Sequence, residues 1–281
     1  MRVVYVNGEF VAESEAKISV FDRGLLFSDA VYEVSAIIDK KLVDNDAHLQ
    51  RLERSLSELG MRSPVTIEEL VELQHQLIEK NNLTEGWLYL QISRGIEDRN
   101  FNYADDLQPS LVMFTQAGSI IDHPKVRKGI KVKTIEDIRW QRRDIKTTML
   151  LAQSLAKKQA IEAGFEDAWL VEDGVVTEGS SNNAYIITWN NEIYTRPASN
   201  KILNGITRRA VNRLAQENDL TVIEQTFTVD QVKQAKEAFS TSASTFVMPV
   251  INIDGTEIGN GRPGELTLAL RQYYVAMARA Q

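Results

Sequence analysis

Two ionisable residues, Lys146 and Glu178, stand just outside regular elements of the sequence. Lys146 lies in a polar segment that leads into a predicted helix over residues 149–163, whose apolar residues recur at spacings of three and four. Glu178 ends the second strand of a predicted hairpin that has an Asp-Gly turn. The stretch 135–183 therefore offers an amine near one end and a carboxylate near the other.

An amine and a carboxylate are the two groups that an electron-sink cofactor requires. Pyridoxal phosphate needs an amine for its Schiff base and a carboxylate opposite its pyridine nitrogen. The carboxylate keeps that nitrogen protonated, so the ring can accept the electrons released when a Cα–H bond breaks. A lysine taken alone is usually a solvated surface residue, and its spacing from Glu178 is not enough to assign Lys146 a catalytic role. The residues around it favour such a role.

Longer motifs surround both residues. The chain reads D-I-K-T-T-M-L-L around Lys146, E-G-S-S-N-N-A-Y from Glu178 and L-N-G-I-T-R from Leu203. Together they resemble the signature of class IV aminotransferases, the fold-type IV pyridoxal phosphate enzymes. The resemblance covers essentially the whole chain and is greatest to bacterial D-amino acid aminotransferases. It implies an enzyme similar to D-amino acid transaminase, which transfers an amino group to a 2-oxo acid such as 2-oxoglutarate or pyruvate.

The resemblance also implies a role for each matching residue. Lys146 would carry the internal aldimine and then move the proton between the substrate Cα and C4′ of the cofactor. Glu178 would pair with the pyridinium nitrogen, and Tyr185 and Arg139 match positions near the cofactor. The other positions expected to bind pyridoxal 5′-phosphate are Arg51, Ser181, Leu203, Ile206, Thr207, Ser242 and Ala243.

Sequence periodicity gives two of these positions a structural setting. A helix predicted over residues 48–59 carries Arg51 near its apolar face, where an arginine usually lays its stem on the core and its head in water. A guanidinium also binds phosphate oxygens in bidentate fashion, and the resemblance selects this alternative. Gly205-Ile206-Thr207 opens another predicted helix, whose free N–H groups attract anions. We therefore expect both places to bind the cofactor phosphate.

Four residues are expected on the substrate side, namely Tyr32, Arg99, Phe101 and Ser180. Tyr32 begins a predicted strand, and a tyrosine in such a setting is more often part of the core. The resemblance implies instead that Tyr32 and Arg99 hold the α-carboxylate of the substrate. The family places Arg99 on a loop that reaches in from the other subunit, which implies a homodimer.

The sequence departs from the family pattern at two positions. Phe101 stands where D-amino acid aminotransferases have a histidine, and a phenyl ring cannot form a hydrogen bond with a carboxylate. This departure favours, as an alternative, an R-selective amine transaminase. Ala243 stands where the family often has a threonine near the phosphate, and Ser242 or Ser244 is expected to supply the hydroxyl instead.

Other functions compete with this interpretation. Branched-chain L-amino acid aminotransferases and aminodeoxychorismate lyases share the fold, but branched-chain enzymes place their carboxylate donors elsewhere than at Arg99. A binding protein that had lost the chemistry would show damage at Lys146 or Glu178, and both are intact. A serine nucleophile at Ser180 or Ser181 has no histidine nearby in sequence to activate it.

Composition excludes several further classes. The chain has 281 residues, a net charge of −7 and no cysteine, so it has neither a basic stripe for nucleic acid nor a disulfide framework. Its three histidines lie far apart, which argues against a metal site. No apolar run approaches the length of a membrane span or of a signal peptide. We expect a cytoplasmic enzyme with small-molecule substrates.

The order of the elements predicts a two-domain α/β (α+β) fold. Residues 1–120 form a smaller α/β domain that carries the substrate side and the dimer contacts. Residues 121–134, with Pro124 and mixed charge, make a linker and the first strand of the second half. Residues 135–281 form a larger, β-rich domain with helices, which is expected to bind the cofactor.

Overall fold

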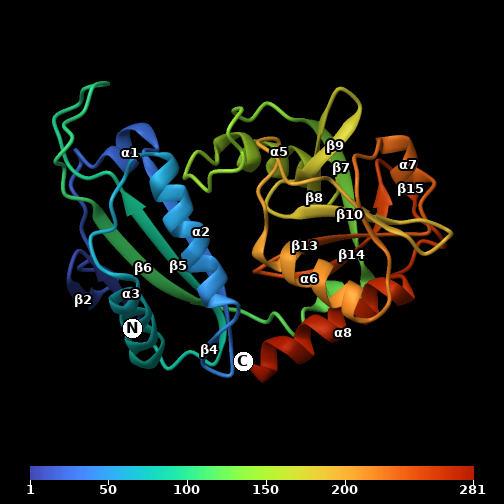
Figure 1. The fold of residues 1–281 in the computed structure, drawn as a ribbon, viewed down its shortest axis with the longest axis horizontal. Coiled ribbons are helices and arrows are strands. Elements are labelled where there is room, and N and C mark those ends of the chain that lie inside the picture. The colour runs from blue at the N-terminus through green and yellow to red at the C-terminus, as the bar shows by residue number, and fades with distance from the viewer. The chain divides into compact units, whose positions relative to one another are not determined.

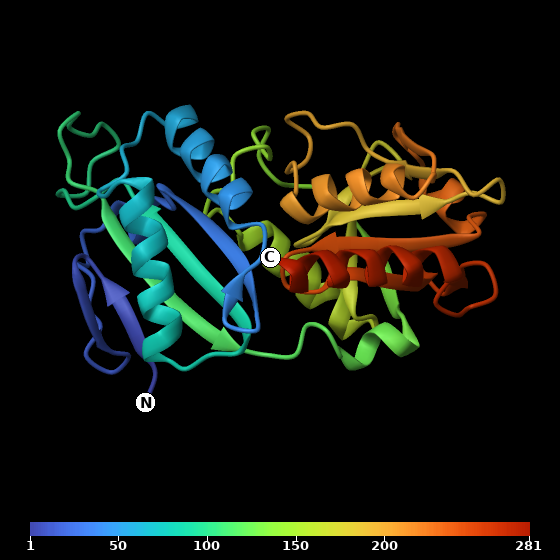
Figure 2. The ribbon, with the colours of Figure 1, turned by 60° about the horizontal axis from the view of Figure 1, so that its bottom comes forward.

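The computed structural model describes residues 1–281, which form two compact units. Unit 1 comprises Met1–Ser119, Ile145–Met149 and Gln281, and unit 2 comprises Ile120–Asp144 and Leu150–Ala280. Each unit has its own sheet with helices packed on it (Figure 1; Figure 2). The predicted mixed α/β class is confirmed. The domain boundaries at residues 120 and 134 remain predictions.

Unit 1 contains an antiparallel sheet of six strands in the order β2-β1-β6-β5-β3-β4. Successive side chains of a strand point to opposite faces, and on β3 this buries Glu33 beneath helix α2 while Tyr32 stays half-exposed on the other face. The elements of unit 1 are β1 (Val3–Val6), β2 (Glu9–Ala12), α1 (Arg23–Phe27), β3 (Ala30–Ile38), β4 (Lys41–Leu42), α2 (Asn45–Glu58), α3 (Ile67–Lys80), β5 (Glu85–Ser93) and β6 (Ser110–Ala117).

The two long helices of unit 1 differ in how well local sequence marks their start. A capping box opens α3, in which the Thr66 hydroxyl accepts from the Glu69 N–H and the Glu69 carboxylate accepts from the Thr66 N–H. Helix α2 begins at Asn45, three residues before the predicted start. The residue before it, Asp44, has a left-handed backbone conformation, and its side chain makes no capping hydrogen bond. A start without a cap leaves no signal in the sequence.

Unit 2 contains a second sheet in the order β12-β11-β10-β13-β14-β7-β8-β9, and β15 pairs with β14. Strand β7 runs parallel to both β14 and β8, and the pairs on either side of this group are antiparallel except β11 with β12. The elements of unit 2 are α4 (Pro124–Lys128), β7 (Ile130–Glu136), α5 (Leu151–Glu162), β8 (Asp167–Glu172), β9 (Val175–Gly179), β10 (Asn183–Ile187), β11 (Ile193–Thr195), α6 (Ile206–Glu217), β12 (Val222–Glu224), α7 (Val229–Lys233), β13 (Glu237–Ser242), β14 (Phe246–Ile253), β15 (Thr256–Glu257) and α8 (Glu265–Ala280).

Helix α5 corrects one sequence-based expectation. The predicted helix over residues 149–163 was expected to bury one apolar face, yet its residues Leu151 and Leu155 are 73% and 55% exposed. The helix packs on the sheet through Ala156 and Ala160 instead, against a cluster that includes Leu170. Small side chains bring the helix backbone close to the strands, so the leucines are turned outward. Among the helices of this structure, none combines the length and the apolar character needed to span a bilayer.

Candidate functional site

Lys146 is held by backbone pairing at the start of β3. Its carbonyl oxygen accepts a 3.0 Å hydrogen bond from the N–H of Tyr32, and the next residue, Thr147, forms an antiparallel bridge with Val31. The N–H of Thr148 then donates to the carbonyl of Ala30 at 3.1 Å. This pairing holds the backbone of the lysine in an extended segment before α5, and its Nζ lies 4.1 Å from the centre of the Tyr32 ring.

Behind Tyr32, on the helix-covered face of the sheet, lies a buried acid with two basic partners. Glu33 receives hydrogen bonds from Nε and Nη2 of Arg51 at 2.8 and 2.7 Å, and Nδ1 of His48 lies 2.7 Å from the same carboxylate. Burial acts to raise the pKa of Glu33, but the Arg51 charge and the hydrogen bonds outweigh it and lower the pKa to about 2. Burial lowers the pKa of His48, so the neutral ring donates to Glu33 at neutral pH.

In unit 2, Glu178 is a buried carboxylate surrounded by donors. Arg139 Nη1 lies 2.5 Å from its Oε1, Asn183 Nδ2 lies 2.9 Å from its Oε2, and the Leu203 N–H lies 3.2 Å from both oxygens. Burial raises the pKa of Glu178 above its ordinary value even though Arg139 acts in the opposite direction. The carboxylate is therefore short of positive charge, and a further cationic donor would stabilise its ionised form.

Asn183 explains why a glycine precedes helix α6. The Asn183 amide also donates to the carbonyl of Leu203 at 2.8 Å, which ties the loop before the helix to β10. A Cβ atom on Gly205 would lie 2.2 Å from Oδ1 of this asparagine. A side chain here would displace this asparagine from its hydrogen bonds to Glu178 and Leu203, which favours glycine before α6 begins at Ile206, as the sequence predicts.

The start of α6 has the features of an anion site. No side chain caps the N–H groups at this end, and the hydroxyl of Thr207 is buried with no hydrogen-bond partner. At the turn between β13 and β14, the Ser242 hydroxyl lies 3.2 Å from that of Ser244 and 2.8 Å from that of Thr245. An uncapped helix start with an orphaned hydroxyl suits a phosphate, and a buried carboxylate short of positive charge suits a protonated pyridine nitrogen. The residues of unit 2 therefore fit pyridoxal phosphate.

The expected substrate residues lie in different settings. Arg99 is exposed, and its guanidinium carbon lies 5.4 Å from the Phe27 ring and 5.6 Å from the Phe101 ring. Phe101 is 80% exposed. The Ser180 hydroxyl is buried and donates to Asp167 at 2.6 Å, so this serine is engaged within the protein.

Two further positions matched by the resemblance also differ in burial. Ser181 is exposed in the turn that follows β9. Tyr185 is fully buried, stacks on Phe239 at 4.5 Å and donates to Asn212 at 2.8 Å. Tyr185 thus fastens α6 to the sheet. No comparison tests the roles of the individual site residues, which stay predictions.

Sequence reasoning missed four residues that contact the expected site: Glu33, His48, Asp137 and Asn183. Strand alternation places Glu33 on the face opposite Tyr32, and an acidic residue on the buried face of a predicted strand is the signal that could have found it. Asp137 and Asn183 carry no such signal, because polar residues beside strand ends are common in any sequence.

Every comparison with known proteins finds aminotransferases. The model of the amino-transferase class IV family matches residues 30–253. D-alanine aminotransferase of Staphylococcus aureus (strain N315) is 39% identical over 275 residues, which are 97% of this chain and 96% of that protein. D-alanine aminotransferase of Bacillus licheniformis is 39% identical over 269 residues, 95% of this chain and 93% of that one.

Solved structures give the same fold. A branched-chain amino acid aminotransferase solved with pyridoxamine 5′-phosphate has a TM-score of 0.91 at 27% identity, covering 100% of this chain and 95% of that one. The branched-chain amino acid aminotransferase of Escherichia coli has a TM-score of 0.89 at 24% identity, covering 99% and 94%, and this likeness concerns the fold alone.

Proposed function

Because the chain belongs to the class IV aminotransferases, we propose that it transfers the amino group of a D-amino acid to a 2-oxo acid such as 2-oxoglutarate or pyruvate. One observation carries the choice of substrate: identity of 39% with a D-alanine aminotransferase extends over 97% of the chain. Branched-chain enzymes share the fold at lower identity, 27% for the one solved with pyridoxamine 5′-phosphate. D-Alanine is therefore the first substrate to test.

Class IV aminotransferases use pyridoxal phosphate, and we assign its parts to residues of this chain. When bound, the cofactor supplies an aldehyde that reacts with amines and a ring that takes up the electrons of the broken Cα–H bond. Glu178 would face the ring nitrogen, and the side chain of Leu203 would pack against the ring plane. The N–H groups of Ile206 and Thr207, the Ser242 hydroxyl and the Arg51 guanidinium would hold the phosphate.

Lys146 is the proposed proton carrier. Its Nζ would accept the proton from the substrate Cα and return it later in the reaction. The Tyr32 ring, 4.1 Å away, stabilises the ammonium form that exists between these two events. The backbone pairing of Lys146 with β3 fixes the attachment point of the side chain, so the amine reaches the same place at each turnover.

We further propose that the substrate carboxylate is held by Tyr32 and by Arg99 from a second copy of the chain. Arg99 is exposed, Ile96 lies three residues before it and is 49% exposed, and Leu25, on the short helix that carries Phe27, is 60% exposed. Exposed apolar groups of this kind are typical of surfaces that pair with another chain. A homodimer would cover them and bring the arginine to its substrate.

The central test combines a cofactor label with activity. Borohydride reduction of the holoenzyme should attach the cofactor to Lys146 and to no other lysine, as read by peptide mass spectrometry. Lys146→Ala should abolish turnover of D-alanine, while Lys158→Ala, an exposed lysine on α5 paired with Glu162, should leave it unchanged. A colourless wild-type protein, or a label on another lysine, would refute the proposal.

A second candidate follows from Phe101. A phenyl ring in this place offers the substrate no hydrogen bond, which favours an R-configured amine without a carboxylate. Initial rates with D-alanine, D-glutamate, L-leucine and (R)-1-phenylethylamine distinguish the candidates. The first proposal expects D-alanine or D-glutamate to be fastest, and it fails if L-leucine or the R-amine is preferred.

A further inference from the structure

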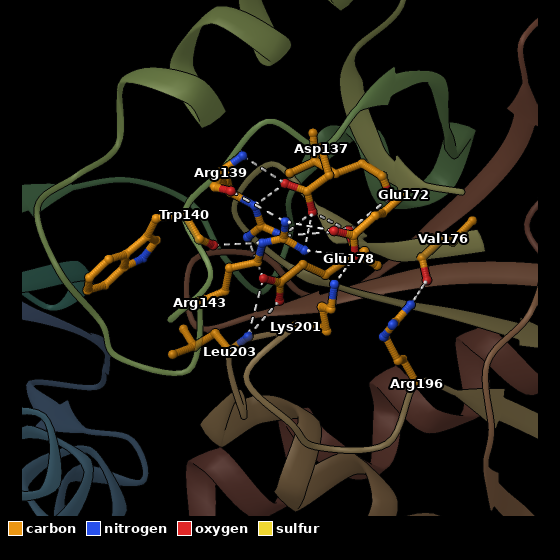
Figure 3. A network of polar contacts seen from close by, with 12 residues as sticks. Asp137, Arg139, Trp140, Arg143, Glu172, Val176, Glu178, Arg196, Lys201 and Leu203 are labelled. Atoms are coloured by element: carbon orange, nitrogen blue, oxygen red, sulfur yellow. Dashed lines mark hydrogen bonds and ion pairs between the residues drawn. The ribbon is translucent and has the colours of Figure 1, made fainter. Parts of the chain in front are cut away.

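Asp137 is a buried carboxylate to which none of the proposed roles refers. It follows β7 (Figure 3), and its side chain is 0% exposed. Arg139 donates to it through Nε at 2.9 Å and Nη2 at 2.7 Å, Arg143 Nη1 lies at 3.2 Å, and the Thr177 hydroxyl donates at 2.6 Å. Both oxygens are thus engaged, and one edge of the Arg139 guanidinium is fully occupied.

This pairing decides how Arg139 meets Glu178. With Nε and Nη2 on Asp137, only Nη1 faces Glu178, and it contacts one carboxylate oxygen, Oε1. An arginine that is free to turn prefers to bind a carboxylate with two parallel hydrogen bonds. Asp137 therefore prevents the two-fold contact and leaves Oε2, which accepts from the neutral donors Asn183 Nδ2 and Leu203 N–H, without a cationic partner.

The charges of the cluster lead to the same conclusion. Three carboxylates, Asp137, Glu172 and Glu178, lie among four cations, Arg139, Arg143, Arg196 and Lys201 (Figure 3). Without Asp137 these four cations, of which Arg139 and Arg143 are buried, would outnumber the carboxylates by two. The field at Glu178 would then disfavour a further positive charge beside it.

We propose that Asp137 is a positioning residue for the cofactor: it holds Arg139 to a single contact with Glu178, so that this carboxylate accepts the protonated ring nitrogen. The inference rests on the proposed function, since it requires the cofactor nitrogen at Glu178. Without Asp137 the Arg139 guanidinium is free to rotate and to form two hydrogen bonds with Glu178. It then displaces the ring N–H from this carboxylate.

The test compares two cofactors on the full-length apoprotein. Pyridoxal phosphate has the ring nitrogen, and its carbocyclic analogue (deazapyridoxal phosphate) has a C–H in that place. Dissociation constants come from titration followed by absorbance. Asp137→Asn should weaken pyridoxal phosphate at least tenfold and leave the analogue within twofold of the wild type. Asp254→Asn removes a carboxylate that receives the Thr134 N–H and hydroxyl instead, and should change neither constant.

Two further variants separate positioning from general damage. In an Arg139→Gln background, Asp137→Asn should weaken pyridoxal phosphate no further, because Asp137 acts through the arginine. Thr177→Val removes one hydrogen-bond donor to Asp137 and leaves the charge of Asp137 in place. Valine also suits a buried strand position. It should weaken pyridoxal phosphate about threefold and spare the analogue, which keeps the idea testable if Asp137→Asn does not fold.

A spectroscopic readout addresses the nitrogen itself. With ¹⁵N in the ring, the NMR shift of the wild-type holoenzyme should report a protonated nitrogen, and that of Asp137→Asn should move toward the unprotonated position. Equal loss of both cofactors, or no loss of either, in Asp137→Asn and Thr177→Val would overturn the proposal. A wild type that binds neither cofactor would instead refute the proposed function, so the two failures are distinguishable.

Discussion

The buried ion pair of Glu33 and Arg51 contributes to the free energy of unfolding by an amount that depends on pH. Glu33 bonds to Arg51 and His48, and its pKa is lowered from 4.5 to about 2. A lowered pKa means that the folded protein holds the ionised form more tightly than the unfolded chain does. The stabilisation is therefore complete above pH 4.5 and is lost as the pH falls toward 2.

The magnitude follows from the size of the shift. Each unit of pKa corresponds to about 1.4 kcal/mol, so Glu33 contributes about 3 kcal/mol to the free energy of unfolding at pH 7. At pH 3 most unfolded chains carry a protonated Glu33 and the contribution falls to about 1 kcal/mol. Replacement by glutamine leaves Arg51 buried without its counter-charge, and losses of about 3–5 kcal/mol are usual for such a change.

The assay is urea unfolding of the wild type and of Glu33→Gln at pH 7 and at pH 3. The difference in unfolding free energy between the two should shrink by about 2 kcal/mol at the lower pH. Groups that titrate equally in both proteins cancel in this difference. Glu13→Gln is the matched control, because Glu13 forms an exposed ion pair with Arg2 in the same unit, which water screens, and it should show a much smaller change. A Glu33→Gln difference that is equal at both pH values would refute the reasoning.

Three other changes have defined outcomes. Arg271→Met should lower the free energy of unfolding, measured with urea, by about 3 kcal/mol. The buried guanidinium donates to carbonyls that include those of Thr245 and Val247, and these would lose their donor. An unchanged free energy of unfolding contradicts this. Ala243→Thr restores a hydroxyl at the turn after β13 and should tighten pyridoxal phosphate roughly fivefold, with no gain for pyridoxal, which lacks the phosphate. Phe101→His should raise kcat/KM for D-alanine over (R)-1-phenylethylamine roughly tenfold, the value of one hydrogen bond to a charged group; an unchanged ratio means that Phe101 does not face the carboxylate.

The sequence by itself determined the local features and the chemistry. The Thr66–Glu69 capping box depends on neighbouring residues only. The Gly205-Ile206-Thr207 motif predicts the start of α6, and the helix begins at Ile206 as expected. The motifs around Lys146 and Glu178 predicted the class of enzyme, which the class IV match over residues 30–253 confirms. Such motifs can be recognised in a sequence because the reaction requires those residue types at those positions, independently of the rest of the chain.

Only the tertiary structure decided which partners the key side chains have. Arg51 was expected to meet a phosphate, and the structure places its guanidinium against Glu33, 18 residues away along the chain. Glu178 and Asp137 share Arg139 because β7 and β9 both flank β8, an adjacency that no local pattern encodes. The exposed leucines of α5 show the same limit, since periodicity marks an apolar face but does not say what covers it. Burial and charge pairing arise from contacts distant in sequence, and for that reason they had to be read from the folded chain.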